Sequence, residues 1–346
     1  MTTYILRRIL ISVPLLLVMS FITFGAINLP EGDPLASYRH DPMFPRAEIE
    51  RLERQYRLDK GFHIQYFHWM TNLFFEWRSA EDEDLTGVRA VLHIVPKRVR
   101  LNLGYSFDHK RPVVDVIGGR LLNTLLLSAV SLLLVWAVAI PVGTYSAVNQ
   151  YSLGDKVLSF LSFIGMSFPN FFLALLLLYL ASLTGVLPTG GLTSTDYHDL
   201  SAAGKFFDIA KHMAIPIMVI VTSALAGMQR LMRGNMLEVL RMQYITTARA
   251  KGLPERKVIY RHALRNAVNP MITIFGYQFS GLLSGVALTE MITSYPGLGS
   301  MMLAAVISRD IYMIMASMLM SGVMLILGNL LADILLSVAD PRISYE

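Results

Sequence analysis

Few residues in this chain are of the types that carry out catalysis, and their spacing does not bring them together. The sequence contains no G-x-S-x-G nucleophile elbow and no H-E-x-x-H zinc motif. His63 and His68 are five residues apart and so do not share a face of a helix, which argues against a metal site on this pair. The chain also lacks cysteine and the G-x-x-x-x-G-K-[ST] phosphate loop. We therefore expect no catalytic residue, metal site or bound cofactor in this chain.

The residues that stand out chemically are basic, and they gather in the stretch TARAKGLPERKVIYRHALRN at 247–266. Gly252 suits the left-handed position just after a helix end, and Pro254 suits the first turn of the next helix. The stretch therefore predicts two short helices meeting at a sharp corner, with small side chains beside Arg249 and Lys251. Such a corner could touch anionic lipid headgroups or insert into a groove of another protein, and the residues alone leave both interpretations open.

The composition places this segment in a membrane protein. Of the 346 residues, 54% are hydrophobic and 16% are charged, and the mean hydropathy is +0.49. Soluble proteins are nearer about 25% charged. Without cysteine no disulfide can form, so the chain's stability must come from packing, and its redox compartment cannot be inferred.

Charge-free runs give the predicted membrane spans, because a helix needs about 20 apolar residues to cross a bilayer. There are six such runs, at 9–29, 121–150, 157–187, 212–229, 271–289 and 311–332. The first is too long for a signal peptide and lacks a small-x-small cleavage site, so it is interpreted as a retained helix. The predicted fold is thus an all-α integral membrane protein with six transmembrane helices and a large external loop domain between helices 1 and 2.

The orientation follows from the basic residues of the short loops. Residues 230–270 carry nine Lys and Arg against two Glu, and such an excess marks the cytoplasmic side. This places the N-terminus, 149–156 and the C-terminus in the cytoplasm, and 31–120, 188–211 and 294–310 outside. Because membrane orientation already explains the basic charge and no nucleic-acid motif accompanies it, nucleic-acid binding is not expected.

The stretch YITTARAKGLPERKVIYRHALRNAVNP at 244–270 resembles the coupling loop of the membrane subunits of binding-protein-dependent ABC importers, in the dipeptide, oligopeptide and nickel permease family. The general importer pattern is Glu-Ala-Ala, three residues, Gly; here Thr246 and Thr247 replace its first two residues, while Thr-Ala-Arg-Ala-Lys-Gly is typical of the peptide branch. The resemblance implies that this loop contacts an ATPase subunit. The residues carried over are Thr247, Ala248, Arg249, Ala250, Lys251, Gly252 and Leu253.

Further segments resemble the same family along nearly the whole chain. They are the opening MTTYILRRILISVPLLLVMSFITF, LERQYRLDK, RPVVDVIGGRLLNTLLL, LPTGG at 187–191, YPGLGSMM at 295–302 and the closing ADPRI. The expected domains are an N-terminal helix at 1–30, an external (periplasmic) domain at 31–118 and a five-helix permease core at 119–346 with the coupling loop at 230–270.

Within the external domain, 45–58 has the spacing of an amphipathic helix with Glu50 and Arg54 one turn apart. The charged insert at 74–100 departs from the family pattern and is interpreted either as a solvated hairpin or as part of a platform for a binding protein.

The resemblance implies a permease subunit that forms half of the translocation path of an ATP-driven importer in a prokaryotic inner membrane. The implied partners are a second permease subunit (a heterodimer), two ATPase subunits that bind ATP and Mg, an external solute-binding protein and membrane lipid. Peptides, nickel chelates, glutathione and oligosaccharides all remain open as substrates.

The competing hypotheses are an ion-coupled secondary transporter or channel without an ATPase, and an intramembrane enzyme or scaffold. Against ion coupling, the six runs contain no ionisable Asp, Glu, Lys or Arg.

Candidates for a gate or substrate path lie in or beside the spans. They are Glu290, just after the fifth run, with Gln278 and Asn170. Asp310 and Asp333 flank the last run and are interpreted as boundary or interfacial charges. The small hydroxyl residues of the spans fit either pore lining or helix packing; they are Ser128, Ser131, Ser162, Ser167, Ser280 and Ser284.

Overall fold

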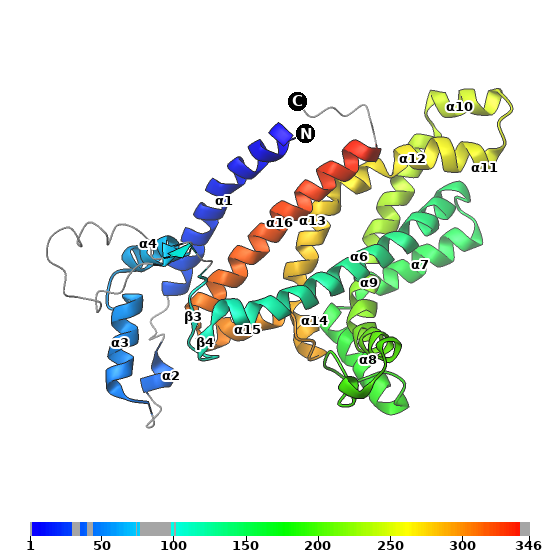
Figure 1. The fold of residues 1–346 in the computed structure, drawn as a ribbon. Helices are drawn as coiled ribbons and strands as arrows, with labels where there is room; N and C mark the ends of the chain where they lie inside the picture. Colours follow the sequence, from blue (N-terminus) through cyan, green and yellow to red (C-terminus); the bar gives the residue numbers. More distant parts are fainter. Residues whose placement is uncertain are drawn as a thin grey trace. The chain divides into compact units, whose positions relative to one another are not determined.

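The structure is a computed structural model that describes residues 2–29, 35–39, 44–73, 75–76, 98–99 and 102–339. Helices dominate these residues (Figure 1). The helices are α1 (Thr2–Asn28), α2 (Ala36–Arg39), α3 (Arg46–Tyr56), α4 (Phe62–Asn72), α6 (Val113–Val148), α7 (Leu153–Ser167), α8 (Asn170–Thr184), α9 (Ala202–Leu240), α10 (Gln243–Ala250), α11 (Glu255–Lys257), α12 (Leu264–Ala267), α13 (Asn269–Gly285), α14 (Ala287–Ile292), α15 (Leu298–Ser308) and α16 (Ile311–Ala339). A 3₁₀ turn η1 (Tyr197–Asp199) and a π-helical turn η2 (Val258–Ala263) join them. The strands are β1 (Phe75–Glu76), β2 (Arg98–Val99), β3 (Tyr105–Ser106) and β4 (Arg111–Pro112).

The chain divides into two compact units, which are described separately. The first unit comprises 1–10, 122–300 and 324–346, and the second comprises 11–121 and 301–323. The first contains the basic segment and the predicted gate residues. The second contains the whole range of the predicted external domain, 31–118.

Four described helices are long and apolar enough to cross a membrane, namely α1, α6, α9 and α16. The pair α7 and α8 makes a fifth if it is counted as one span. These elements overlap five of the six predicted runs. The remaining run, 271–289, is divided between α13, which is 17 residues long, and the short α14. The count of six spans therefore stays a prediction.

Two predicted helix boundaries differ from the structure. The run at 157–187 is not one helix, because α7 and α8 meet at a bend of 98°. Phe168 and Pro169 are extended there, and proline disfavours the helical conformation in the residue before it. The run at 212–229 is the middle of a longer helix, the 39-residue α9, with Pro216 inside it. Charged residues at the edges of a span continue this helix rather than end it, so counting apolar residues underestimates its length.

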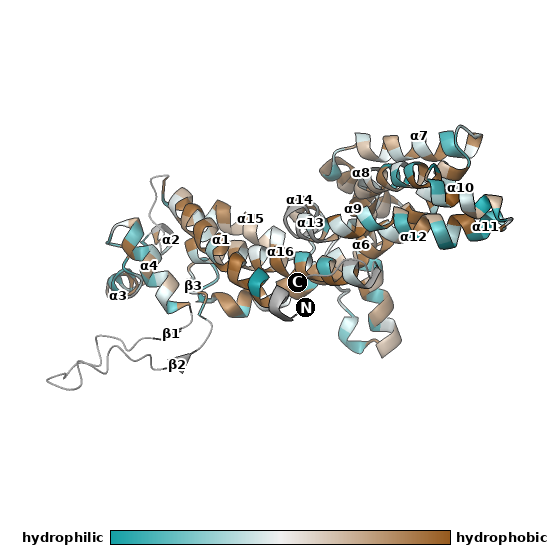
Figure 2. Cartoon of the chain, turned by 90° about the horizontal axis from the view of Figure 1, so that it is seen from above, coloured by the Kyte–Doolittle hydropathy of each residue, from teal (hydrophilic) through white to brown (hydrophobic). Residues whose placement is uncertain are grey.

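The core of the first unit is built where α6, α9 and the basic segment pack together. Its buried residues include Val135 and Ala139 of α6 and Met228, Met232 and Met236 of α9. Figure 2 shows apolar residues along α1 and α16, and hydrophilic residues gathered over α10 and α11. The short helices α10 and α11 are therefore polar elements of the first unit, whose long helices are apolar.

The second unit contains an aromatic cluster around Phe107. The hydroxyl of Tyr38 donates to the Phe107 carbonyl at 2.8 Å, and the rings of Tyr56 and Phe107 lie 5.5 Å apart. The amphipathic helix predicted at 45–58 is confirmed as α3. Its Arg54 donates to the backbone carbonyl of Glu50 at 3.3 Å, and this bond is made to the backbone rather than to the predicted carboxylate partner.

Only the two ends of the charged insert belong to the described residues. Phe75 and Glu76 pair in antiparallel register with Val99 and Arg98. Paired ends agree with the hairpin interpretation of the insert. Residues 77–97, and the closing ADPRI from residue 340 onward, lie outside the described part of the chain.

Candidate functional site

The corner predicted in the basic segment is present. Helix α10 ends at Ala250, and Gly252 takes the left-handed conformation with φ +76°. The Gly252 N–H donates to the Arg249 carbonyl at 2.9 Å, and the Leu253 N–H donates to the Ala248 carbonyl at 3.4 Å. Pro254 is extended at the N-cap of α11. The chain thus reverses within a few residues because glycine tolerates a positive φ and proline favours the restart.

The underside of the corner is packed into the core of the first unit. It buries side chains from α10 and from η2, which join the cluster that contains Met232 and Met236 of α9: Ile245, Ala248, Val258, Ile259 and Ala263. Ala248 is only 8% exposed, so its side chain is directed into the chain. The basic segment is therefore an ordered structure anchored on α9. An exposed loop that only oriented the chain in a membrane would not need this packing.

The outer side of the corner is exposed and carries a clasp between its two helices. The guanidinium of Arg249 reaches across Gly252 to Glu255, with Nη2 at 2.6 Å from Oε1 and Nε at 3.1 Å from Oε2. This bonding raises the pKa of Arg249 and lowers that of Glu255. Ala250 and Lys251 are exposed beside the clasp. The corner therefore presents a small, basic knob of fixed shape.

A second ion pair ties α9 to the start of α7. Arg233 donates to Asp155 through Nε at 3.1 Å and through Nη2 at 2.9 Å. Asp155 also accepts from the Tyr151 N–H at 2.9 Å, and its own N–H donates to the N-cap residue Ser152. Arg233 adds to the basic charge of residues 230–270, but it lies within α9 and has a structural partner.

Glu290 lies at the junction of three segments and is completely buried. Its Oε1 accepts from the Thr124 hydroxyl of α6 at 2.8 Å, and its Oε2 accepts from the Ser300 N–H at the start of α15 at 2.8 Å. The Thr124 oxygen in turn accepts from the Leu298 N–H at 2.7 Å. A side chain at Gly297 would overlap the Glu290 carboxylate. Glu290 therefore joins α6, α14 and α15, and its carboxylate contacts the chain itself in this conformation.

Two glycine-containing motifs that are about a hundred residues apart in the sequence meet beside Glu290. The Gly191 N–H of LPTGG donates to the Thr293 carbonyl at 3.2 Å, just before YPGLG. A Cβ at Gly190 would lie 3.1 Å from the same oxygen, so a side chain there would require a small shift of one of the two segments. The loop after α8 is thereby held against the turn between α14 and α15.

The other predicted path residues have mixed environments. Gln278 accepts from the Trp136 indole at 3.2 Å, so it joins α13 to α6. Asn170 is exposed at the first position of α8.

Ser128 and Ser131 are fully buried and have no hydrogen-bond partner within the described residues. Ser162 bonds to Leu158 and Gln229, and Ser167 bonds to Phe163. The side chains of Ser280 and Ser284 lie outside the described part. Burial of the two serines of α6 favours helix packing over pore lining for them.

Sequence reasoning missed Thr124 and Asp155. Thr124 sits in an apolar run where a threonine has no distinctive signal. Asp155 lies between predicted spans, and its position three residues after Ser152 was a local sign of a helix start.

These features define a mainly helical, multi-pass membrane protein with an ordered polar knob packed on α9. Residues 139–345 match the family described as "Binding-protein-dependent transport system inner membrane component", and residues 1–128 match the N-terminal part of such components. The chain therefore belongs to the binding-protein-dependent family of inner-membrane permease components, as the coupling-loop motif predicted.

Relatives match the chain over its full length. The oligopeptide transport system permease protein AppB of Bacillus subtilis is 37% identical, with 100% of each chain covered. The dipeptide transport system permease protein DppB of Escherichia coli K12 is 33% identical, again with 100% of each chain covered. A putative peptide permease protein of Brucella ovis is 33% identical over 99% of each chain.

A solved structure shares the fold. It is an inward-facing MetNI methionine ABC transporter, which matches with a TM-score of 0.53 and 14% identity over 66% of this chain and 97% of that chain. At this identity the match concerns the fold alone. It supports an ABC permease architecture for the aligned part of the chain.

Proposed function

We propose that this chain forms half of the translocation path of an ATP-driven importer for peptides. The full-length relatives named as oligopeptide and dipeptide permeases support this substrate class. The main support for this mechanism is the corner at Gly252, which has a left-handed backbone and is packed on α9. An ATPase subunit bound to this rigid corner could move α9. ATP hydrolysis by separate ATPase subunits then drives movement of this chain through the corner.

The proposed assembly has six spans with the N-terminus and residues 230–270 in the cytoplasm. Residues 1–30 form the first span, 31–118 form an external domain and 119–346 form the permease core. A second permease of the same family completes the pore. Two ATPase subunits bind ATP and Mg²⁺ and dock on the cytoplasmic corners, and an external binding protein delivers the peptide.

The proposed ATPase contact is the exposed side of the corner. It consists of Thr247, Arg249, Ala250, Lys251, Gly252 and Leu253, of which all but the half-buried Leu253 are exposed. Ala248 differs from these residues, because its buried side chain holds α10 against η2, so that force on the knob is passed to α9. A rigid contact suits this role because a flexible loop would absorb the motion of the motor.

Glu290 is proposed as part of a gate. Its bonds to Thr124 and Ser300 hold α6, α14 and α15 together in this conformation. Opening a path between these helices would require these bonds to break or to be exchanged. Gln278, through Trp136, is proposed to hold α13 to α6 in the same way. Asn170, exposed at the start of α8, is proposed to contact the substrate path.

The test is an affinity purification of the complex from its native membrane in mild detergent, followed by mass spectrometry. The variant replaces the exposed residues Arg249, Ala250 and Lys251 by Glu, and leaves the buried Ala248 in place. The control replaces Arg256 and Lys257 of α11, which are also exposed, by Glu, so that the change in net charge is similar. We expect ATPase subunits and a second permease with the wild type, and loss of the ATPases alone in the variant but not in the control.

If no ATPase accompanies the wild type, the proposal is wrong and ion-coupled transport becomes the hypothesis to pursue. If the control loses the ATPases as completely as the variant, the contact depends on overall charge and the corner is not its centre.

A further inference from the structure

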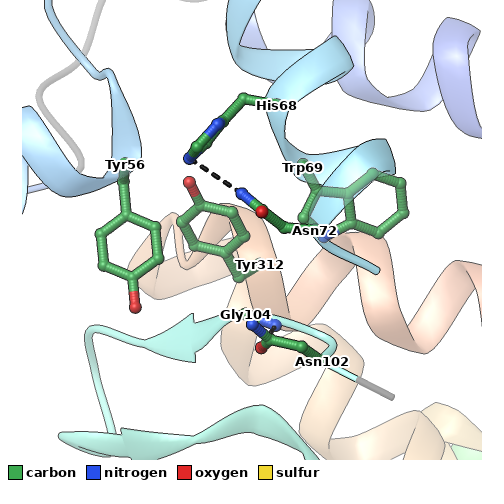
Figure 3. A pocket seen from close by; sticks show the side chains of 7 residues that line it. All are labelled: Tyr56, His68, Trp69, Asn72, Asn102, Gly104 and Tyr312. Atoms are coloured by element: carbon green, nitrogen blue, oxygen red, sulfur yellow. Dashed lines mark hydrogen bonds between the residues drawn. The ribbon is translucent and has the colours of Figure 1, made fainter. Parts of the chain in front are cut away.

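The second unit contains a small open cavity of about 90 Å³, lined by Tyr56, His68, Trp69, Asn72, Asn102, Gly104 and Tyr312. Figure 3 shows the hydrogen bond between His68 and Asn72 in its wall, which measures 2.9 Å. Pockets that hold a small ligand are about 300–1,000 Å³, so this cavity is too small for one. Exposed polar groups with a clearer need of a partner lie in the first unit, at the break between α7 and α8.

The break leaves the first turn of α8 without hydrogen-bond acceptors among the described residues. The opening N–H groups of a helix have no carbonyl partner within it. Here the residue before the helix is Pro169, whose side chain does not cap them. The N–H of Leu173 donates to the Pro169 carbonyl at 3.1 Å. The N–H groups of the three preceding residues, Asn170, Phe171 and Phe172, therefore remain free to donate.

The side chains at the break are exposed. Residues 167–170 are all exposed, and so are Phe171 and Phe172. Asn170 places an amide, which can both donate and accept, beside the free N–H groups. The rings of Phe168 and Phe172 are stacked with their centroids 6.0 Å apart. The break therefore presents a polar surface beside two aromatic rings.

The position of the break along α9 gives its depth in the membrane. Ser162 bonds to Gln229, at one end of the charge-free run 212–229. Gly165 packs on Thr222, where a Cβ would come within 2.9 Å of the threonine methyl group. The two helices thus run side by side, and α7 advances along α9 toward the middle of the run. Each residue advances a helix by about 1.5 Å, so the break begins about 5 Å beyond Gly165, away from both ends of the run.

Hydrocarbon cannot cover a surface of this kind at this depth. Lipid tails offer no hydrogen-bond acceptor, and non-helical backbone is tolerated there only where protein buries it or where it lines a water-filled cavity. A protein partner would have to supply a matched acceptor to each of three neighbouring N–H groups. Water supplies acceptors in any arrangement, and one half of a transport path must contain a wet surface.

We propose that the break between α7 and α8, at residues 167–170, lines the water-filled translocation path. This inference rests on the proposed function, because it names the wetted surface of the half-path that the chain contributes. The Pro169 bend then has a role in transport: it turns the polar start of α8 toward water in the middle of an otherwise apolar pair of helices.

The test measures whether water reaches the break. The chain has no cysteine, so Ser167→Cys and Asn170→Cys each introduce a single thiol. The matched control is Val18→Cys in α1, where the side chain is 57% exposed on a continuous apolar helix. The reagent is a small, membrane-impermeant cationic methanethiosulfonate, which reacts with the thiolate, a form that apolar surroundings disfavour. It is applied to the assembled complex in membrane vesicles of both orientations, with and without Mg-ATP, and its reaction is followed on the gel band of this chain.

We expect both thiols at the break to react at least tenfold faster than Val18→Cys from at least one side of the membrane. Ser167→Cys exchanges one oxygen for sulfur, so it keeps the test valid if Asn170→Cys does not assemble. Rates equal to that of Val18→Cys would overturn the proposal. Thiols that react in the solubilised single chain but not in the complex would show that the second permease covers the break, and would also overturn it.

The importer function is measured separately, by copurification of the ATPases with the wild type and with the same cysteine variants. Slow reaction at the break in a complex that retains its ATPases overturns the lining of the path alone. A wild-type chain that purifies without ATPases overturns the proposed function.

Discussion

Among single residues, Glu290 shows how a buried carboxylate can hold helices together without contacting solvent. Its two oxygens each receive a hydrogen bond, one from α6 and one from the first turn of α15, where backbone N–H groups favour a negative partner. The contact depends on Gly297, because any side chain there would occupy the space of the carboxylate. Position 297 must therefore be glycine so that the Glu290 carboxylate has room.

Gly297→Ala is expected to destabilise the protein. The added methyl group must displace the Glu290 carboxylate, and overpacking of this kind typically costs about 1–3 kcal/mol. Gly227→Ala in α9 is the matched control, because nothing lies within 4 Å of a Cβ at that position. Thermal unfolding followed by tryptophan fluorescence should show a lower Tm for Gly297→Ala and no decrease for Gly227→Ala. Equal Tm values for the two variants would mean that the Glu290 junction is not tightly packed.

Among the structural elements, the corner between α10 and α11 depends on one backbone conformation. Gly252 has φ +76° but open space around a Cβ, so a substitution there is strained by the backbone alone. The left-handed conformation costs roughly 1–2 kcal/mol for an ordinary residue, and Asn tolerates it better than a β-branched residue does.

Gly252→Val should therefore uncouple ATP hydrolysis from transport, while Gly252→Asn keeps most of the coupling. The measurement is substrate-stimulated ATP hydrolysis and uptake by the reconstituted complex, with equal membrane insertion as the check on both variants. Normal coupled transport by Gly252→Val would refute the need for a left-handed corner.

The clasp across the same corner predicts the outcome of a charge reversal. Arg249→Glu should weaken ATPase attachment in a salt-sensitive way, because it sets two carboxylates against each other. The double variant Arg249→Glu with Glu255→Arg restores the internal pair but not the basic side chain at position 249. Because Arg249 is proposed to contact the ATPase directly, attachment should stay weak in the double variant. Recovery of attachment would show instead that Arg249 acts only by shaping the knob. The measurement for both variants is the affinity for the ATPase, obtained by titration at increasing salt concentrations.

The pH dependence of the clasp follows from the direction of the pKa shift. Arg249 lowers the pKa of Glu255, so the stability that the pair contributes is fully present above the ordinary Glu pKa. It is lost only as the pH falls through the lowered value. Because both side chains are exposed, the contribution of the pair to stability is small.

For the whole molecule, the number and direction of the spans can be tested directly, because the chain has no cysteine. Single cysteine substitutions at Tyr151, Lys251 and Asp196 each report on which side of the membrane one loop lies. In intact cells a membrane-impermeant maleimide should label Asp196→Cys alone, and all three after lysis. The opposite pattern would reverse the orientation.

The same labelling tests the count of six. An even number of spans places both termini on one side, so Arg7→Cys and Ser344→Cys should both be protected in intact cells. Labelling of only one of the two would give an odd number of crossings and would exclude six.

Much of the fold was predictable from local patterns. Apolar runs predicted where membrane-length helices lie, and glycine followed by proline predicted the corner at Gly252, because both signals depend on residues that are neighbours in the chain. The amphipathic helix α3 followed from spacing alone. Helix ends were less predictable: α9 extends through charged residues, and Pro169 bends a run that composition treats as continuous.

The sequence by itself determined that this is a membrane protein, which segments are apolar and to which family it belongs, since composition and contiguous motifs are properties of the chain as written. Only the tertiary structure decided which polar residues act together. Glu290 meets Thr124, Asp155 meets Arg233, Gly191 meets Thr293, and the Tyr312 ring completes a cavity with Trp69, each across many intervening residues. These contacts depend on how helices pack, and helix packing is set by shape and hydrogen bonding between distant segments that no local pattern records.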